Sequence, residues 1–175
     1  AEEREGYLAA DRRHRFRISS ENPMKLKRLR QILKRHAGDR ILVIGQYLRQ
    51  LKEVARSIGA PLLTGHTPQD ERDRLYSAFR SGDVPTLIVS KVGNFAVDLP
   101  NASVAVQISG TYGSRQEEAQ RLGRVLRPKA DGREATFYSL VTRDTRDQDF
   151  AQRRQRFLME QGYQYEIEEQ EEVLQ

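Results

Sequence analysis

Apolar residues recur along this chain in two patterns that alternate with each other. Short runs rich in β-branched residues are typical of strands buried inside a parallel sheet. Runs of this kind cover residues 41–44, 86–89 and 104–108, and residues 61–63 and 135–141 are further predicted strands. Between them, apolar residues spaced three and four positions apart predict amphipathic helices. The alternation indicates an α/β fold with a mostly parallel sheet and helices on both of its faces.

Helix ends are marked by residues with known positional preferences. Asn22 and Pro23 combine a cap with a first-turn proline, and Gly59 is typical of the position just after a helix. Thr67 and Pro68 are expected to cap the third helix. The predicted helices span about residues 22–37, 47–58, 68–81, 114–127 and 145–161.

The first three helices are each expected to bury one apolar face. The predicted buried residues are Leu26, Leu29 and Leu33, then Leu48, Leu51, Ala55 and Ile58, then Leu75 and Phe79. The other faces of the first helix carry Lys25, Lys27, Arg28, Arg30, Lys34 and Arg35. We interpret these basic residues as a solvated face, with contact to DNA as the alternative.

Length and charge favour one basic domain with segments outside the fold at both ends. A chain of 175 residues is long enough for a single sizeable core. Residues 1–165 hold all 30 basic residues but only 20 of the 25 acidic ones, a net charge of +10, because five glutamates crowd positions 166–175. This suits a nucleic-acid partner, although solubility alone could explain it. We expect a linker or docking arm over 1–21, the folded domain over 22–165 and an acidic flexible tail over 166–175.

Several classes of site are not expected from the composition. Cysteine is absent, and His14, His36 and His66 lack the spacing of metal ligands. No apolar stretch approaches the roughly 18–20 residues needed to cross a bilayer. We therefore expect no metal site of this chain's own and a soluble, intracellular protein. The start at Ala1, without methionine, is compatible with a processed or excised piece.

The loop that follows the run 86–89 carries groups suited to phosphate and sugar. Ser90, Lys91, Gly93 and Asp98 supply a hydroxyl, an ammonium, a flexible glycine and a carboxylate. Glycine allows close approach of the backbone to a phosphate, and a carboxylate can accept hydrogen bonds from ribose hydroxyls. In sheets of this class ligands gather beyond the carboxyl ends of the strands, where this loop opens. Ser-Lys-x-Gly also occurs in plain turns.

The predicted helix 114–127 presents one strongly polar face. Gln120, Arg124 and Arg127 stand at i, i+4 and i+7 and project an amide and two guanidinium groups in one direction. Such a row suits a polyanion. For a single arginine the favoured interpretation is that it only complements the negative end of the helix dipole.

The stretch from Gln120 to Arg127 matches Gln-Arg-x-Gly-Arg-x-x-Arg, the sixth signature motif of superfamily-two helicases. Further matches are Ser90–Gly93, Phe95, Asp98–Pro100, Gln107–Ser109, Gly113–Arg115, Glu118–Ala119, Phe137–Val141, Arg154–Leu158 and Gln161–Tyr163. Together they make the chain resemble the carboxy-terminal helicase domain of the XPB family across about residues 22–165. The resemblance implies the second of two RecA-like domains, with three layers and a mostly parallel sheet.

The resemblance also implies roles for individual residues. Arg124 and Arg127 would be arginine fingers that stabilise charge on the γ-phosphate of ATP, with Gln120 helping to place the phosphates. Asp98 would lie near the nucleotide sugar, and Gly93 is also assigned to the nucleotide. DNA-backbone contacts would come from Ser90, Lys91, Gln46, Thr64 and Gly65, with turn formation as the alternative for the last three.

An ATPase needs further parts that this chain lacks. None of its 12 glycines precedes a lysine, so no Walker loop is present. Asp70-Glu71-Arg72-Asp73 spells a helicase magnesium motif, but it is expected in the first turn of a helix, where acids favour the dipole. ATP and Mg²⁺ would therefore be bound mainly by an amino-terminal helicase domain of the same protein, and the isolated chain is expected to be inactive.

The resulting hypothesis is a motor domain of an ATP-dependent DNA helicase or translocase in DNA repair and transcription. A repair nuclease or transcription machinery are possible partners, and no membrane is expected. The heavy use of arginine favours a prokaryotic protein of the cytoplasm, and a eukaryotic one would be nuclear. The alternatives are a non-catalytic DNA- or partner-binding module and the motor half of another superfamily-two translocase.

Overall fold

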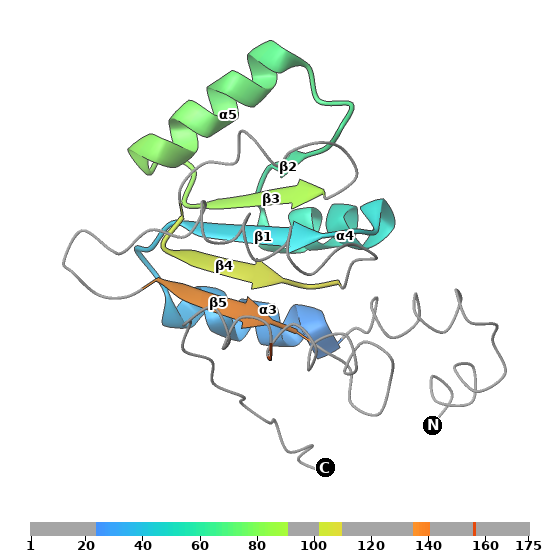
Figure 1. Cartoon of the computed structure of the whole chain (residues 1–175), viewed down its shortest axis with the longest axis vertical. Helices are drawn as coiled ribbons and strands as arrows, with labels where there is room; N and C mark the ends of the chain where they lie inside the picture. The colour runs from blue at the N-terminus through green and yellow to red at the C-terminus, as the bar shows by residue number, and fades with distance from the viewer. Residues whose placement is uncertain (1–23, 91–101, 110–134, 141–155, 157–175) are drawn as a thin grey trace, which may run out of the picture.

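The computed structural model describes residues 24–90, 102–109, 135–140 and residue 156. These residues form a five-stranded sheet in the order β2-β3-β1-β4-β5, drawn in Figure 1. Every strand pairing is parallel. The predicted α/β fold with a parallel sheet is confirmed.

The strands follow the predicted apolar runs. They are β1 (Ile41–Gly45), β2 (Leu62–Leu63), β3 (Thr86–Ser90), β4 (Val104–Gln107) and β5 (Thr136–Ser139). All residues of β1 and β4 are buried. These two strands lie inside the sheet with helices packed on it, which explains why their sequences are continuously apolar instead of alternating.

Three helices are described: α3 (Met24–Arg35), α4 (Leu48–Ile58) and α5 (Gln69–Ser81). Gly59 follows α4 with φ 67° and Gly82 follows α5 with φ 89°, the left-handed geometry that glycine adopts without strain. The predicted Thr67 cap is wrong. Pro68 occupies the cap position of α5, and the Thr67 hydroxyl accepts a hydrogen bond from the Thr64 amide at 2.9 Å instead.

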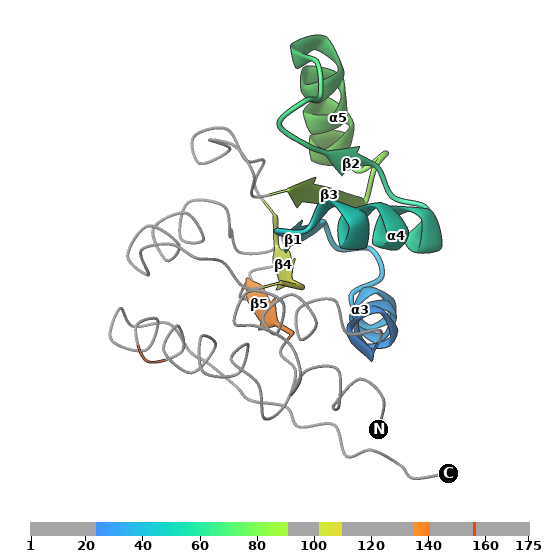
Figure 2. The same ribbon diagram turned by 90° about the vertical axis from the view of Figure 1, so that its right-hand side faces the viewer.

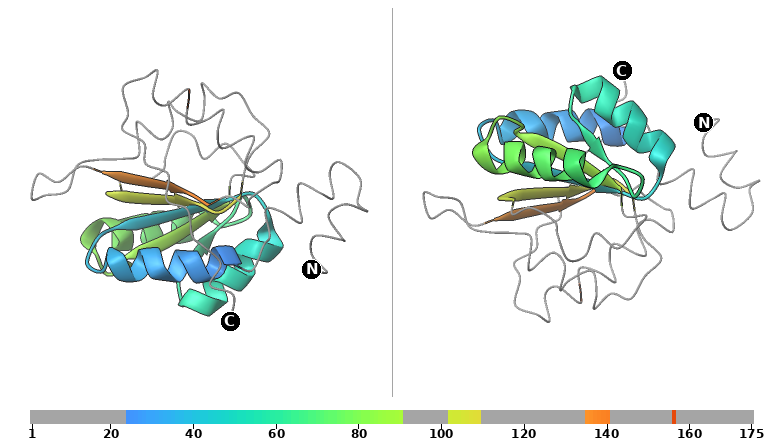
Figure 3. Two further views of the ribbon diagram at one scale, coloured as in Figure 1. Left: turned by 90° about the horizontal axis from the view of Figure 1, so that it is seen from below. Right: turned by 90° about the horizontal axis from the view of Figure 1, so that it is seen from above.

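The helices cover opposite faces of the sheet. Side chains of α3 and α4 pack with alternate residues of β1, β3 and β4, and both helices lie on one side of the strands in Figure 2 and in the left panel of Figure 3. The buried residues of this first core are Leu29, Ile32, Ile41, Val43, Leu51, Val54, Ile88, Val104, Val106 and Ile108. Those of the second core, under α5, are Leu42, Ile44, Leu63, Tyr76, Phe79, Leu87, Val89 and Ala102.

The helical faces are rotated slightly from their predicted positions. In α3 the buried residues are Lys25, Leu29 and Ile32, whereas Leu26 and Leu33 are only partly buried. In α4 they are Gln50, Leu51 and Val54, while Leu48, Ala55 and Ile58 are half-buried. In α5, Phe79 is buried as predicted, but Tyr76 takes the place expected for Leu75. Each shift moves the buried stripe by about one position around the helix.

A polar contact joins α3 to the edge strand β5. His36 lies just after α3, and its Nε2 is 2.7 Å from the Tyr138 hydroxyl, while its Nδ1 is 3.1 Å from a carboxylate oxygen of Asp39. The rings of His36 and Tyr138 meet edge to face. His36 therefore has a structural role in this fold.

Several predicted features lie outside the described residues. These are the arm 1–21, the helix 114–127, most of the helix 145–161 and the acidic tail 166–175. Arg156, inside the predicted helix 145–161, is helical and exposed. The domain boundaries stay predictions. No helix within the described part is long and apolar enough to span a bilayer.

Candidate functional site

The carboxyl ends of β1, β2 and β3 meet at one edge of the sheet. Strands β1 and β3 are parallel, and Gly45 at the end of β1 is opposite Ser90 at the end of β3. The chain therefore leaves both strands at the same level. Leu63 is opposite Val89, so Thr64 follows beside Ser90. The structure thus brings together three of the residues predicted to contact DNA: Gln46, Thr64 and Ser90.

A serine two residues past β4, Ser109, fixes the chain after β1. The Ser109 hydroxyl accepts a hydrogen bond from the backbone amide of Gln46 at 2.6 Å. The Ile108 amide donates to the Ile44 carbonyl at 2.9 Å, which continues the pairing of β1 and β4 beyond the strand itself. Ser109 was not predicted as a site residue. Its only signal in the sequence is its place in the Gln107–Ser109 match to the helicase family.

Gly45 allows the elements at this edge to approach closely. A Cβ atom at this position would lie 2.6 Å from Leu51 Cδ2 in α4 and 3.2 Å from both Ile108 Cγ1 and Ser109 Oγ. Such distances require the neighbours to shift. The glycine therefore does more than end the strand, because it lets α4 and the end of β4 pack against β1.

Lys25 reaches the same edge from α3. Its side chain is buried, and Nζ donates to the Ile108 carbonyl at 3.0 Å. The sequence interpretation that placed Lys25 on a solvated face is therefore wrong. A lysine stem can cover apolar surface while its ammonium reaches a polar group. Here that group is a carbonyl just past β4, so Lys25 helps to fix the backbone that carries Ser109.

Thr64 and Gly65 form a turn that leads into α5. The Thr64 amide donates to the Thr67 hydroxyl, and its own hydroxyl accepts from the His66 amide at 3.2 Å. Arg72 of α5 donates to the Thr64 carbonyl at 3.3 Å. The turn that we considered as the alternative is present, and within it Gly65 is exposed.

The acidic stretch that imitates a magnesium motif lies in α5 as predicted. Asp70 and Glu71 are in its first turn. Asp73 accepts a hydrogen bond from the Gln69 side chain at 2.8 Å, and Glu71 lies 3.8 Å from the Arg74 guanidinium. In the part of the chain that the structure describes, no three His, Cys, Asp or Glu side chains are grouped to hold a metal ion.

The whole chain matches one protein-family model. The model is described as the ERCC3/RAD25/XPB C-terminal helicase, and the match covers residues 1–175. This chain belongs to the XPB helicase family.

Relatives of this XPB-family chain come from bacteria and eukaryotes. The DNA 3'-5' helicase XPB of Mycobacterium tuberculosis is 54% identical over 172 residues, which are 98% of this chain and 31% of that protein. The general transcription and DNA repair factor IIH helicase/translocase subunit XPB/SSL2 of Saccharomyces cerevisiae is 40% identical over 167 residues, 92% of this chain and 20% of that protein. The chain therefore spans at most about a third of the length of these relatives.

Solved structures support the fold. The C-terminal domain of the DEAD-box protein Dbp5 superimposes with a TM-score of 0.66 at 20% identity, covering 78% of this chain and 79% of that one. The yeast DEAD-box splicing factor Prp28 gives 0.62 at 22% identity, with 78% and 30% covered. The XPB-family chain has the RecA-like architecture of carboxy-terminal helicase domains, as predicted.

The remaining predicted site residues of this XPB-family chain lie in two segments that follow Ser90 and Ser109 in the sequence. Residues 91–101 follow Ser90, and residues 110–134 follow Ser109. These segments contain Lys91, Gly93, Asp98, Gln120, Arg124 and Arg127, which are outside the described residues. Ser90 itself is fully buried, and the Gln46 carboxamide oxygen is buried without a hydrogen-bond partner among the described residues.

Proposed function

We propose that this chain is the second motor domain of an ATP-dependent DNA helicase or translocase that acts in DNA repair and transcription. The observation that carries the proposal is the match of the XPB-family model to residues 1–175. The strand-end geometry supports it, because both predicted motif segments start at one edge of the sheet. A 3'-5' direction of movement is proposed from the name of the Mycobacterium tuberculosis relative.

ATP is proposed to bind as substrate between this domain and an amino-terminal helicase domain of the longer protein. Phosphoryl transfer spreads negative charge over the γ-phosphate in the transition state, and inserted guanidinium groups stabilise that charge. Arg124 and Arg127 would supply these groups, and Gln120 would help to place the phosphates. Asp98 and Gly93 would contact the nucleotide. Mg²⁺ would be held mainly by the amino-terminal domain.

DNA is proposed to run over the carboxyl edge of the sheet. Gly65 is exposed in the turn after β2, so its backbone is open to a phosphate. The Gln46 amide already donates to Ser109 and Thr64 is bonded within its turn, so we assign both to holding the edge in shape for contact. Ser90 is buried, and its role would be to position the Lys91 ammonium.

The setting of the motor is proposed from its relatives. The Saccharomyces cerevisiae relative is named as a subunit of a general transcription and DNA repair factor, which supports transcription or repair machinery as partners. A repair nuclease is proposed from the sequence resemblance alone. We place the protein in a prokaryotic cytoplasm, because the bacterial relatives from Mycobacterium tuberculosis and Kineococcus radiotolerans are 54% and 52% identical, whereas the Saccharomyces cerevisiae relative is 40% identical.

Replacing the proposed fingers in the longer protein tests the motor assignment. Arg124→Ala and Arg127→Ala should each lower DNA-stimulated ATP turnover by roughly 10³-fold or more, the effect expected of an arginine finger. Arg80→Ala, which removes an exposed arginine of α5, is the matched control and should keep wild-type turnover. Steady-state phosphate release would measure all three. Wild-type turnover in both finger variants would refute the assignment.

A non-catalytic DNA- or partner-binding module is the second candidate, and the basic surface of α3 favours it. The same experiment separates the two functions. A binding module predicts that no substitution in this chain changes ATP turnover, whereas the motor predicts that Arg124→Ala and Arg127→Ala do.

A further inference from the structure

The two helical layers of the domain differ sharply in charge. Helix α3 contains six basic residues and no acidic one, and α4 contains three basic residues and one acidic residue, Glu53. Helix α5 contains three basic and three acidic residues. All three helices pack on the same sheet, so the fold itself does not require this difference.

Six cations of α3 and α4 form an exposed set that we call the basic layer. Its members are Lys27, Arg30, Lys34, Arg49, Lys52 and Arg56. Within the described residues, none of the six forms an ion pair with a carboxylate. By contrast, Arg74 of α5 lies 3.8 Å from Glu71 on its own helix. Ion pairs with carboxylates of the described residues therefore do not neutralise the positive charge of the basic layer.

The basic layer is continuous across the two helices. The Arg30 guanidinium donates to the Ser57 carbonyl near the end of α4 at 3.4 Å, which places the middle of α3 beside the end of α4. Both helices also lie on one side of the sheet in Figure 2. A ligand that binds one helix would therefore meet the cations of the other.

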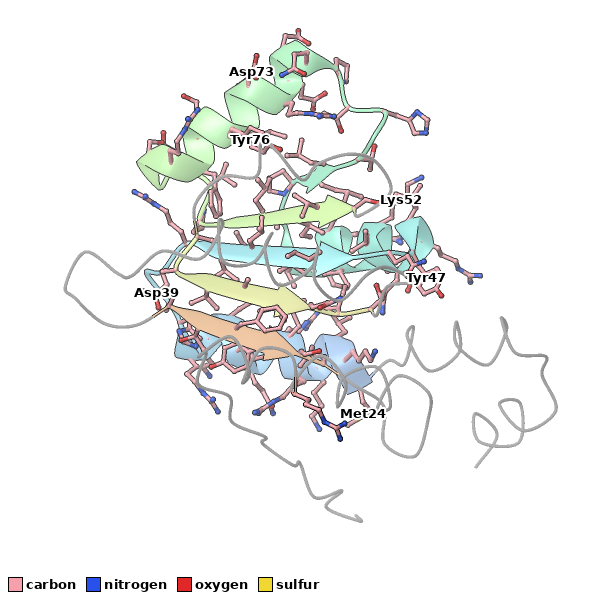
Figure 4. The ribbon with its side chains drawn as sticks, viewed as in Figure 1. Met24, Asp39, Tyr47, Lys52, Asp73 and Tyr76 are labelled. Carbon is pink, nitrogen blue, oxygen red and sulfur yellow. The ribbon has the colours of Figure 1, made fainter. Side chains whose placement is uncertain are left out.

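The layer begins at the carboxyl edge of the sheet. Met24 at the start of α3 and Tyr47 just before α4 both lie at the ends toward which the strand arrows point in Figure 4, whereas Asp39 lies at the opposite edge. Lys52 belongs to the first turns of α4, five positions after Tyr47 in the sequence. The cations thus extend from the proposed DNA site along the outer surface of α3 and α4.

We infer that the basic layer binds the phosphate backbone of DNA outside the strand-end site. A row of lysine and arginine side chains without local carboxylate partners matches a polyanion with regularly repeated charge. Solubility would be served equally by cations on α5, where the charges are balanced instead. This inference adds a second contact surface to the proposed function, and it holds whether or not the arginine fingers are assigned correctly.

Paired substitutions on α4 and α5 test this inference. Arg49→Gln with Arg56→Gln removes two exposed arginines from the basic layer, one of them in the last turn of α4. Arg74→Gln with Arg80→Gln removes two exposed arginines from α5, one of them in its last turn. The two double variants therefore match in residue type, charge change and loss of one last-turn cation.

The measurement is fluorescence anisotropy of a labelled 25-base-pair duplex against the full chain, at about 50 to 200 mM salt. The α4 double variant should bind roughly tenfold more weakly at low salt. The negative slope of log K against log salt should become less steep by about two, one for each lost phosphate contact. The α5 double variant should stay within about twofold of wild type with an unchanged slope. Circular dichroism would verify that both are folded.

Each other outcome overturns the inference. If both double variants bind the duplex equally more weakly, DNA binding depends only on the net charge of the chain. Unchanged binding in both would mean that the basic layer does not contact DNA. Weaker binding of a polyglutamate probe by the α4 double variant, with duplex binding unchanged, would mean that the layer binds an acidic protein instead. ATP turnover of the Arg124→Ala variant tests the motor assignment separately.

Discussion

The layer formed by α3 and α4 and the layer formed by α5 pack on opposite faces of one sheet, but only their buried sides are alike. Both present apolar side chains to alternate residues of the same strands, Leu29 and Leu51 on one face and Tyr76 and Phe79 on the other. Their outer sides differ, because α5 has balanced charge and the other two helices are strongly basic. The apolar residues on the buried sides are needed for folding. The charges on the outer sides are not, so we attribute their difference to binding at the surface.

The largest expected effect on the free energy of unfolding comes from a substitution in α5. Phe79 and Tyr76 are the buried residues of α5, and Phe79 is fully buried. Phe79→Ala should lower the free energy of unfolding by about 3–5 kcal/mol, because it leaves a cavity between α5 and the sheet. Urea unfolding followed by circular dichroism would measure this loss.

Ser77→Ala is the control for that variant, since Ser77 is exposed on the same helix. It should change stability by no more than about 0.5 kcal/mol. If Phe79→Ala costs less than about 1 kcal/mol, α5 is not held to the sheet by its apolar face, and the likeness between the two layers fails.

The next largest effect on stability is expected at Lys25, the buried lysine of α3. Lys25 is buried and donates to the Ile108 carbonyl, whereas Lys27, two positions later, is exposed. Lys25→Met keeps much of the apolar stem but removes the donor, and the carbonyl loses its partner. We expect a loss of about 1–3 kcal/mol in the free energy of unfolding.

Lys27→Met provides the matched comparison, with an expected change within about 0.5 kcal/mol. The two variants separate cations that stabilise the fold from cations that are free to bind DNA. Equal effects would show that the Lys25 ammonium has no structural role, and Lys25 would then belong with the basic layer. Chemical unfolding of both proteins under identical conditions decides between these results.

The sequence predicts the sheet well because its information there is local. Buried parallel strands require continuous apolar runs, and the runs 41–44, 86–89 and 104–108 appear as β1, β3 and β4. Gly59 marked the end of α4 for an equally local reason, since only glycine adopts its left-handed backbone without strain.

Contacts between distant residues escape such patterns. Lys25 counts as polar in any helical pattern, and its burial depends on a carbonyl 83 positions away. The hydrogen bond between Gln46 and Ser109 spans 63 positions, and that between His36 and Tyr138 spans 102. Thr67 was misread because threonine hydroxyls serve turns as readily as helix caps. At the site, the sequence indicated the strand-end edge through Gln46, Thr64 and Ser90, but not the groups that hold it.

The smallest expected effect lies on the outer side of α5. Arg74 and Glu71 form an ion pair at 3.8 Å with side chains 74% and 48% exposed. Because solvent and salt screen such a pair, Arg74→Gln should lower the free energy of unfolding by less than about 0.5 kcal/mol, and Glu71→Gln by a similar amount. Thermal unfolding at low and high salt would measure both, and the difference from wild type should shrink at high salt. A loss above about 1 kcal/mol would give the balanced charges of α5 a structural role. The charge difference between the layers would then reflect the needs of the fold as well as those of DNA, and the Arg74 variant could no longer serve as the neutral control for the basic layer.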